Sequence, residues 1–136
     1  MAAVSILKQV SVFAENRLGS LQAVLQALAD REINIRALSI ADTSDFGIVR
    51  MILSDTDLGL RALRDAGLTA STTEVLRVEL PDTPGGLLKA AVRPLSEAGL
   101  NVEYIYAFVD MPLEKAAAVV KVDNVQKARQ VLAAET

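Results

Sequence analysis

The strongest constraint on the fold of this chain is an internal repeat. Asn16–Leu21 and Asp82–Leu87 share one order: Asn or Asp, then Gly three residues later, then Leu two residues after the Gly. A shift of 66 residues superposes Gly19 on Gly85. Downstream, Asn34 lies 15 residues after Gly19 and Asn101 lies 16 after Gly85, each between two apolar residues. The two halves of the chain therefore follow one structural plan.

The first half has the pattern of a strand, a helix, a hairpin of two strands, a second helix and a fourth strand. Apolar and polar residues alternate in the strands, whereas apolar residues recur at helical spacing in the helices. Ser54 and Asp57 are expected to begin the second helix, and Gly67 suits a left-handed residue at its end. These elements are expected at residues 7–13, 18–32, 34–41, 47–53, 54–67 and 68–75.

The second half repeats this pattern but ends sooner. Its strands are expected at 74–80, 102–109 and 116–122, with helices over 85–98 and from Asp123 to the end of the sequence. Residues 68–80 before Pro81 contain neither Gly nor Pro, so one strand is expected to run from the first repeat into the second. The fold class is α+β: two tandem ferredoxin-like βαββαβ repeats with antiparallel sheets, over 1–74 and 75–136, the second lacking its last strand.

Composition excludes several kinds of function. The sequence has no His and no Cys, which removes imidazole bases, thiolate nucleophiles and the common zinc ligands. A net charge of −3 argues against nucleic acid as a partner. No apolar run is long enough to span a membrane, and a cytoplasmic location is expected. Asp55 and Asp57 are expected to cap a helix rather than to bind a metal, and no cofactor is expected.

The paired loops resemble those of the ACT domain, a small regulatory module that binds amino acids. The resemblance covers nearly the whole chain and is closest to proteins made of tandem ACT domains without an enzyme domain. It implies that the ligand lies where the strand-to-helix loop of one ACT unit meets the strand after the helix of another. The positions that would contact it are Asn16, Gly19, Leu21, Asn34, Asp82, Gly85, Leu87 and Asn101.

The chemistry of these residues fits a free amino acid, although each has a structural alternative. The start of a helix attracts a carboxylate, and Asp82 or the Asn amides can accept hydrogen bonds from an ammonium group. Asn16 and Asp82 are equally consistent with helix caps, and Asn34 and Asn101 with left-handed helix ends. Tyr104 and Tyr106 are expected on one face of a strand, as core residues or as a wall of the site, and Phe46 is expected to be structural.

The residues of the two loops allow three functions. The favoured one is an amino-acid sensor that forms a homodimer, because the shorter second repeat leaves a sheet edge open. The alternative is a protein–protein interaction module without a ligand. A catalytic role is disfavoured because no nucleophile accompanies the possible acids and bases, which are Glu103, Asp110, Lys115 and Lys121.

Overall fold

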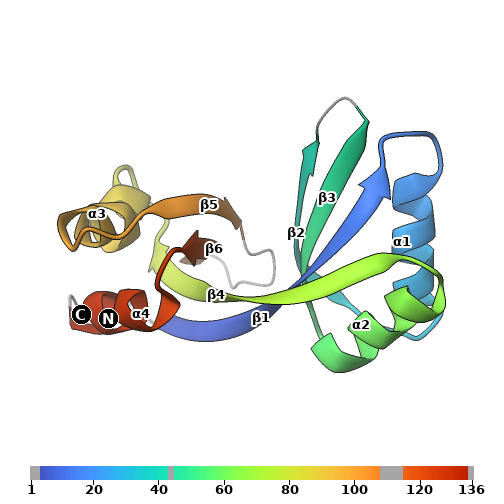
Figure 1. The fold of residues 1–136 in the computed structure, drawn as a ribbon. Helices are drawn as coiled ribbons and strands as arrows, with labels where there is room; N and C mark the ends of the chain where they lie inside the picture. Colours follow the sequence, from blue (N-terminus) through green and yellow to red (C-terminus); the bar gives the residue numbers. More distant parts are fainter. Residues whose placement is uncertain (1–3, 43–44, 108–114, 135–136) are drawn as a thin grey trace. The chain divides into compact units, whose positions relative to one another are not determined.

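The computed structural model describes residues 4–42, 45–107 and 115–134 (Figure 1). The helices are α1 (Ser20–Ala29), α2 (Thr56–Asp65), α3 (Arg93–Glu97), which follows a π-helical turn at Leu88–Val92, and α4 (Val125–Ala134). The strands are β1 (Val4–Glu15), β2 (Ile35–Asp42), β3 (Phe46–Leu53), β4 (Thr69–Pro81), β5 (Val102–Ala107) and β6 (Lys115–Val122). This is the order of elements that the sequence predicts, in an α+β fold. Residues 108 and 109, the end of the strand expected at 102–109, lie outside the described residues.

The chain forms two compact units, which divide strands β1 and β4 between them. One unit is Lys8–Thr73, here called the first unit, and the other is Met1–Leu7 with Glu74–Thr136, the second unit. The order of hydrogen-bonded strands is β2-β3-β1-β4-β6-β5. Strand β4 is continuous over 13 residues, which confirms that one strand runs from the first repeat into the second.

The start of β1 supplies the strand that the second repeat lacks. Among the described residues, α4 is the last element of the second repeat, which has no fourth strand of its own, as expected. Val4–Leu7 belong to the second unit, which gives that unit the order β1-β4-β6-β5, while the first unit has β2-β3-β1-β4. Both orders are that of a ferredoxin-like sheet, in which the first and third strands are central. Val4–Leu7 thus complete the sheet of the second unit, whose other strands lie in the second half of the chain.

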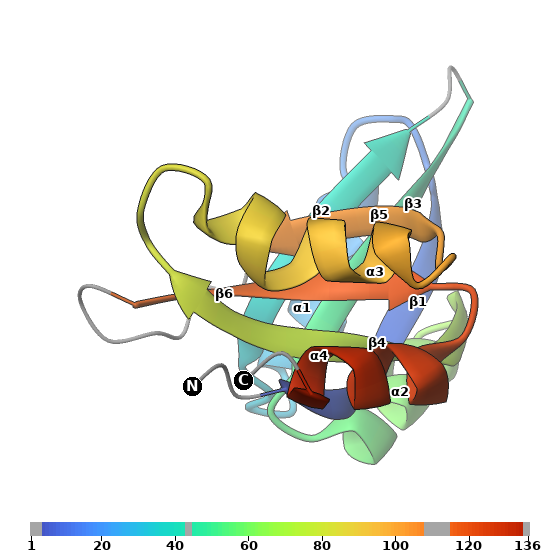
Figure 2. The same cartoon turned by 90° about the vertical axis from the view of Figure 1, so that its left-hand side faces the viewer.

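Each unit has its own hydrophobic core between its strands and its two helices. Figure 1 shows α1 and α2 in the first unit, and Figure 2 shows α3 and α4 over one face of β4, β5 and β6. Val10, Val12, Leu28, Met51 and Leu63 are fully buried in the first core. The second core centres on Leu76, Val78, Leu95, Val120 and Leu132, and the partly buried Val4 and Ile6 pack against it. No helix among the described residues is long and apolar enough to cross a membrane.

The two strand-to-helix loops have the same backbone structure, which confirms the repeat. Gly19 and Gly85 both take the left-handed conformation, with φ of 90° and 76°. In the first loop, the Ser20 amide donates to the Arg17 carbonyl and the Ala23 amide to the Gly19 carbonyl. The second loop has the same bonds 66 residues later, from Gly86 to Thr83 and from Lys89 to Gly85. Only glycine takes this conformation without strain, which explains why both loops contain it.

The π-helical turn accounts for the one-residue difference between the repeats. In this turn the Arg93 amide donates to the carbonyl of Leu88, five residues earlier. A π turn holds one residue more than an α turn, so it absorbs an inserted residue without rotating the rest of the helix. Pro94 follows at once, and it lacks the amide that an α-helical bond to Ala90 would need. The spacing of 16 rather than 15 between Gly85 and Asn101 is consistent with this turn.

Two neighbouring residues could cap each of the helices α2 and α4, and in both the second of the two is the cap. Asp55, one of the two Asp residues expected to cap a helix, caps α2 in place of Ser54, and its Oδ1 accepts a hydrogen bond from the Leu58 amide at 3.1 Å. Asn124, not Asp123, caps α4, and its Oδ1 accepts from the Lys127 amide at 3.0 Å. The preceding residue in each pair bonds elsewhere: Ser54 Oγ accepts from the Asn34 amide and Asp123 Oδ1 from the Asn101 amide.

We expect Asp55→Ala and Asn124→Ala each to lower the free energy of unfolding by about 1 kcal/mol, the usual effect of losing a cap. Chemical denaturation measures this, and Arg61→Ala on the exposed face of α2 is the control. Losses no larger than that of the control would contradict the assignment of the caps.

Candidate functional site

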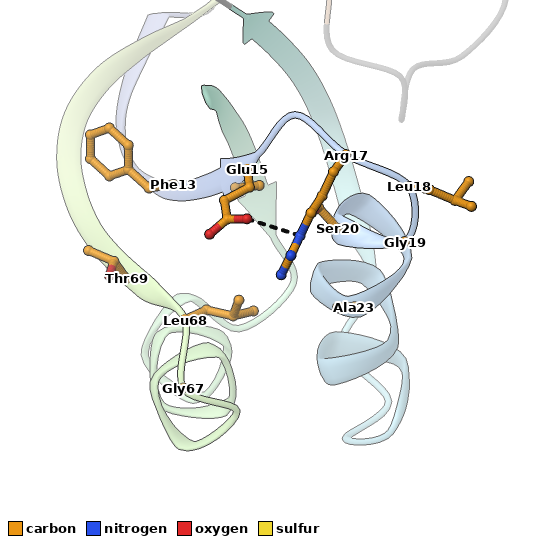
Figure 3. A pocket seen from close by; sticks show the side chains of 11 residues that line it. Phe13, Glu15, Arg17, Leu18, Gly19, Ser20, Ala23, Gly67, Leu68 and Thr69 are labelled. Atoms are coloured by element: carbon orange, nitrogen blue, oxygen red, sulfur yellow. Dashed lines mark ion pairs between the residues drawn. The ribbon is translucent and has the colours of Figure 1, made fainter. Parts of the chain in front are cut away.

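The loop between β1 and α1 borders two hollows, both within the first unit. The larger has a volume of about 550 Å³ and lies between this loop, the end of β1 and the turn from α2 to β4. Gly19, one of the residues expected to contact a ligand, lines it. Figure 3 shows the pocket with the start of α1 on one side and the α2–β4 turn on the other.

The far wall of the larger pocket is held by backbone hydrogen bonds. Gly67, with φ of 81°, ends α2 in the left-handed conformation that the sequence predicts. The Gly67 amide donates to the Arg64 carbonyl and the Leu68 amide to the Leu63 carbonyl, each at 3.0 Å. The guanidinium of Arg64 donates to the Ala70 carbonyl at 3.1 Å. These bonds fix Leu68 and Thr69 at the pocket wall.

A pair of opposite charges lines the larger pocket, and sequence reasoning missed it. Arg17 Nε lies 3.0 Å from Glu15 Oε2, with 72% of the Arg17 side chain and 56% of the Glu15 side chain exposed. Figure 3 shows the two side chains pointing toward one another beside the first turn of α1. The signal was present in the sequence as an acid at the end of a strand and a base two residues later, on either side of Asn16. Such pairs are common on protein surfaces, which is why the pattern was not singled out.

The smaller hollow, of about 190 Å³, brings together two other predicted residues. Asn16 and Leu21 line it, together with Ile40 of β2 and Val49 of β3. The Asn16 amide donates to the Asp45 carbonyl at 2.9 Å, which ties the loop to the β2–β3 hairpin. The N-cap of α1 is Gly19, which has no side chain. Asn16 is therefore not the N-cap of α1.

Asn34 and Asn101 lie away from the loops of their own repeats. Ile35 pairs with Leu53, whereas Glu15 pairs with Phe46, so Asn34 lies at the opposite end of β3 from the β1–α1 loop. Its alternative role as a left-handed helix end is wrong, because the residue with positive φ that follows α1 is Glu32, not Asn34. In the second repeat Gly99 has positive φ, so the same role is wrong for Asn101. The backbone amides of both Asn residues bond to the side chain that precedes a helix cap: Asn34 to Ser54 and Asn101 to Asp123.

The second loop is packed more tightly than the first. Asp82, Gly85 and Leu87 are exposed, and Gly85 has the conformation described above. Gly86 is buried, and a Cβ there would overlap the carbonyl oxygen of Pro81. The equivalent residue of the first loop is Ser20, whose side chain lines both hollows. The two loops therefore differ in the space that they leave for a ligand.

The remaining candidate residues have structural surroundings. Tyr104 and Tyr106 stack with ring centroids 6.4 Å apart, and pair with Lys121 and Val119 on the sheet face opposite the helices, so they are not core residues of the second unit. Lys121 forms an ion pair with Glu103 at 3.1 Å. Asp110 and the Lys115 side chain lie outside the described residues. Within 4–42, 45–107 and 115–134, no three acidic side chains gather as a metal site would require.

Comparison with known proteins identifies the family. The sequence pattern of the ACT domain pair matches residues 5–136. A solved structure from Bacteroides thetaiotaomicron is 37% identical, with a TM-score of 0.90 over 97% of this chain and 90% of that one. No curated protein sequence matches the chain.

Two more distant structures share the fold. The regulatory subunit of aspartate kinase from Thermus thermophilus is 15% identical, with a TM-score of 0.68 over 98% of this chain and 95% of that one. Aspartokinase III of E. coli, in complex with lysine and aspartate, is 16% identical, with a TM-score of 0.58 over 98% of this chain and 31% of that one. With two matching glycine loops, two ferredoxin-like units and the family pattern over residues 5–136, this chain belongs to the family of ACT domain pairs.

Proposed function

We propose that this chain is a regulatory protein, without catalytic activity of its own, that binds a free amino acid through its strand-to-helix loops at the interface between ACT units. The observation that carries the proposal is the pocket of about 550 Å³ beside Gly19, at the start of a helix. Pockets of 300–1,000 Å³ are typical of small-molecule sites. The E. coli aspartokinase III structure, of which 31% is covered by the fold of this chain, is a complex with lysine and aspartate.

The residues proposed to contact the ligand fall into two sets, one for each loop. Asn16, Gly19 and Leu21 lie at the loop that borders the two hollows, and Asp82, Gly85 and Leu87 lie at the tighter one. Asn34 and Asn101 would contribute only to a site that a second ACT unit helps to form, because each lies at the other end of a sheet from its own loop. The looser first loop is the favoured site.

A thermal-shift screen against the twenty amino acids tests the proposal. A ligand that binds only the folded protein at 100 times its dissociation constant adds about 2.7 kcal/mol to the free energy of unfolding. We expect an upward shift with one amino acid or a small group of similar ones. Equal melting temperatures in all twenty would contradict amino-acid binding and favour the alternative, an interaction module without a ligand.

The proposed assembly is a homodimer that uses the free edge of β2. This strand ends the strand order of the described sheet, and Leu38 and Ile40 on it are 40% and 49% exposed. Both pair with core residues of β3, Met51 and Val49, so they lie on the face that carries the helices. Leu21 of α1 is also exposed and lines the same hollow as Ile40. An exposed edge with apolar side chains is suited to pairing with a second copy.

We expect Ile40→Lys to weaken dimerisation by about tenfold or more, because it places a charge in the proposed apolar interface. Sedimentation velocity over a range of protein concentrations measures the change. Leu88→Lys is the matched control, since Leu88 is a similarly exposed apolar residue, at 46%, in the second unit. Dimerisation that is equally strong in Ile40→Lys and the control would exclude the β2 edge as the interface, and a monomer throughout would exclude the dimer.

A further inference from the structure

The larger pocket contains the two charges that a free amino acid needs, next to a helix start that lacks a side-chain cap. Glu15 and Arg17 line it, and their side chains meet at 3.0 Å. Gly19 is the N-cap of α1 and has no side-chain oxygen to accept from the amides of the first turn, which also contains no acidic residue. The first-turn amides and the guanidinium are therefore donors on one side of the pocket, and the carboxylate of Glu15 is an acceptor close to them.

We propose that Glu15 and Arg17 bind the charged end of the amino acid, Arg17 its carboxylate and Glu15 its ammonium group, and that the pocket selects an apolar side chain. The inference rests on the proposed function and names the ligand class and the anchoring residues of that site. An Arg guanidinium binds a carboxylate through two parallel hydrogen bonds, and the positive end of the α1 dipole favours the same negative group. An ammonium group has three N–H donors, and an ionised carboxylate such as that of Glu15 is a charged acceptor for them.

Glu15 and Arg17 can separate from one another and bind the charged groups of the ligand at little cost, because their ion pair is exposed. An exposed ion pair contributes little to stability, so its separation costs little. The ligand replaces one charged pair with two, one at each end of the zwitterion, and both form beside apolar surface. The two side chains are two residues apart, on either side of the chain reversal that leads into α1, so they lie close enough to reach the neighbouring carboxylate and ammonium groups of one α-carbon.

The rest of the pocket indicates the kind of side chain that the ligand carries. Phe13, Ala23 and Leu68 line it, and Figure 3 shows Phe13 and Leu68 on the side away from α1. The charged lining residues are Glu15 and Arg17, which the α-carboxylate and α-ammonium groups use. A ligand side chain with its own charge would have no opposite charge left in the lining and would lose hydration on entry. An apolar amino acid is therefore the expected ligand.

Isothermal titration calorimetry of the full chain with each of the twenty amino acids tests this, with variants at the two charges. We expect an apolar amino acid to bind, and Arg17→Gln and Glu15→Gln each to weaken it about ten- to a hundredfold, as loss of a charge-assisted hydrogen bond does. Arg17→Lys should retain most of the affinity. Arg61→Gln and Glu74→Gln make the same charge changes at exposed positions outside the pocket lining and should bind as the unchanged chain does.

The exchange variant Glu15→Arg/Arg17→Glu separates a binding role from a structural one. This variant keeps an ion pair but places the positive charge at position 15, at the end of β1, and the negative charge at position 17. We therefore expect an unchanged melting temperature and a loss of binding. Amidation of the ligand carboxylate or acetylation of its amine should each abolish binding. If an amino acid binds with equal affinity to the unchanged chain and to both Gln variants, this inference is wrong while the proposed function stands. If none of the twenty binds to the unchanged chain, both are wrong.

Discussion

Replacing Val4 and Ile6 together with serine is expected to lower the free energy of unfolding by about 3 kcal/mol. Both side chains are partly buried against the core of the second unit, although they lie at the other end of the sequence from it. Burial of an apolar side chain of this size contributes roughly 1.5 to 3 kcal/mol when complete, so two that are each mostly buried together give the expected loss. The effect is large because the first strand completes the second unit's sheet.

Denaturation monitored by hydrogen exchange distinguishes this result from general damage. The amides of β4 and β6 in the second unit should lose protection, while those of β3 should keep it. Ser5→Ala is the matched control, since Ser5 lies between the two residues but is exposed, and it should change stability by less than about 0.5 kcal/mol. A double variant as stable as this control would mean that the first strand does not complete the second unit.

Gly86→Ala is expected to lower the free energy of unfolding by about 2 to 3 kcal/mol. The added methyl group would overlap the Pro81 carbonyl oxygen and lie 3.4 Å from the Thr83 hydroxyl. The backbone oxygen cannot move aside as a flexible side chain can, so the loop must open, and overpacking of this kind typically costs 1 to 3 kcal/mol.

Neighbouring glycines separate the steric effect from backbone strain. Gly85 has φ of 76°, and a Cβ added there would meet only the Lys89 side chain, at 3.7 Å. Gly85→Ala should therefore lower the free energy of unfolding by about 1 to 2 kcal/mol from backbone strain alone. Gly19→Ala has open space around it and should cost a similar amount. Urea denaturation of the three variants measures the order, and a Gly86→Ala variant that is no less stable than Gly85→Ala would show that the second loop is not closed on Pro81.

The repeat made most of the fold predictable from sequence. Gly67 is expected from the sequence to end a helix in the left-handed conformation, as it does in the structure, because few other residues adopt that conformation without strain. The sequence does not decide between two neighbouring candidates for each helix cap, since Ser54 and Asp123 can cap as well as their neighbours can. The choice depends on the amides of Asn34 and Asn101, which approach only when the strands have paired.

Two features could not be predicted because they depend on contacts distant in sequence. The pattern of β1 indicates a strand over residues 7–13, but nothing local shows that Val4 and Ile6 pack against a core made 70 or more residues later. Likewise, Leu68 lines the pocket beside Gly19, and only the packing of α2 places it close to the β1–α1 loop. The acid at the end of β1 and the base two residues later are visible in the sequence, but only the pocket distinguishes Glu15 and Arg17 from an ordinary surface pair.

Two-dimensional amide NMR of the isotope-labelled chain shows whether the first loop binds an amino acid. Pools of the twenty amino acids are added and the backbone amide shifts are followed. We predict that at least one pool moves the amides of Asn16–Ser20 and of Leu68 and Thr69, with smaller changes elsewhere. An unchanged spectrum in every pool, or shifts confined to Asp82–Leu87, would contradict binding at the first loop.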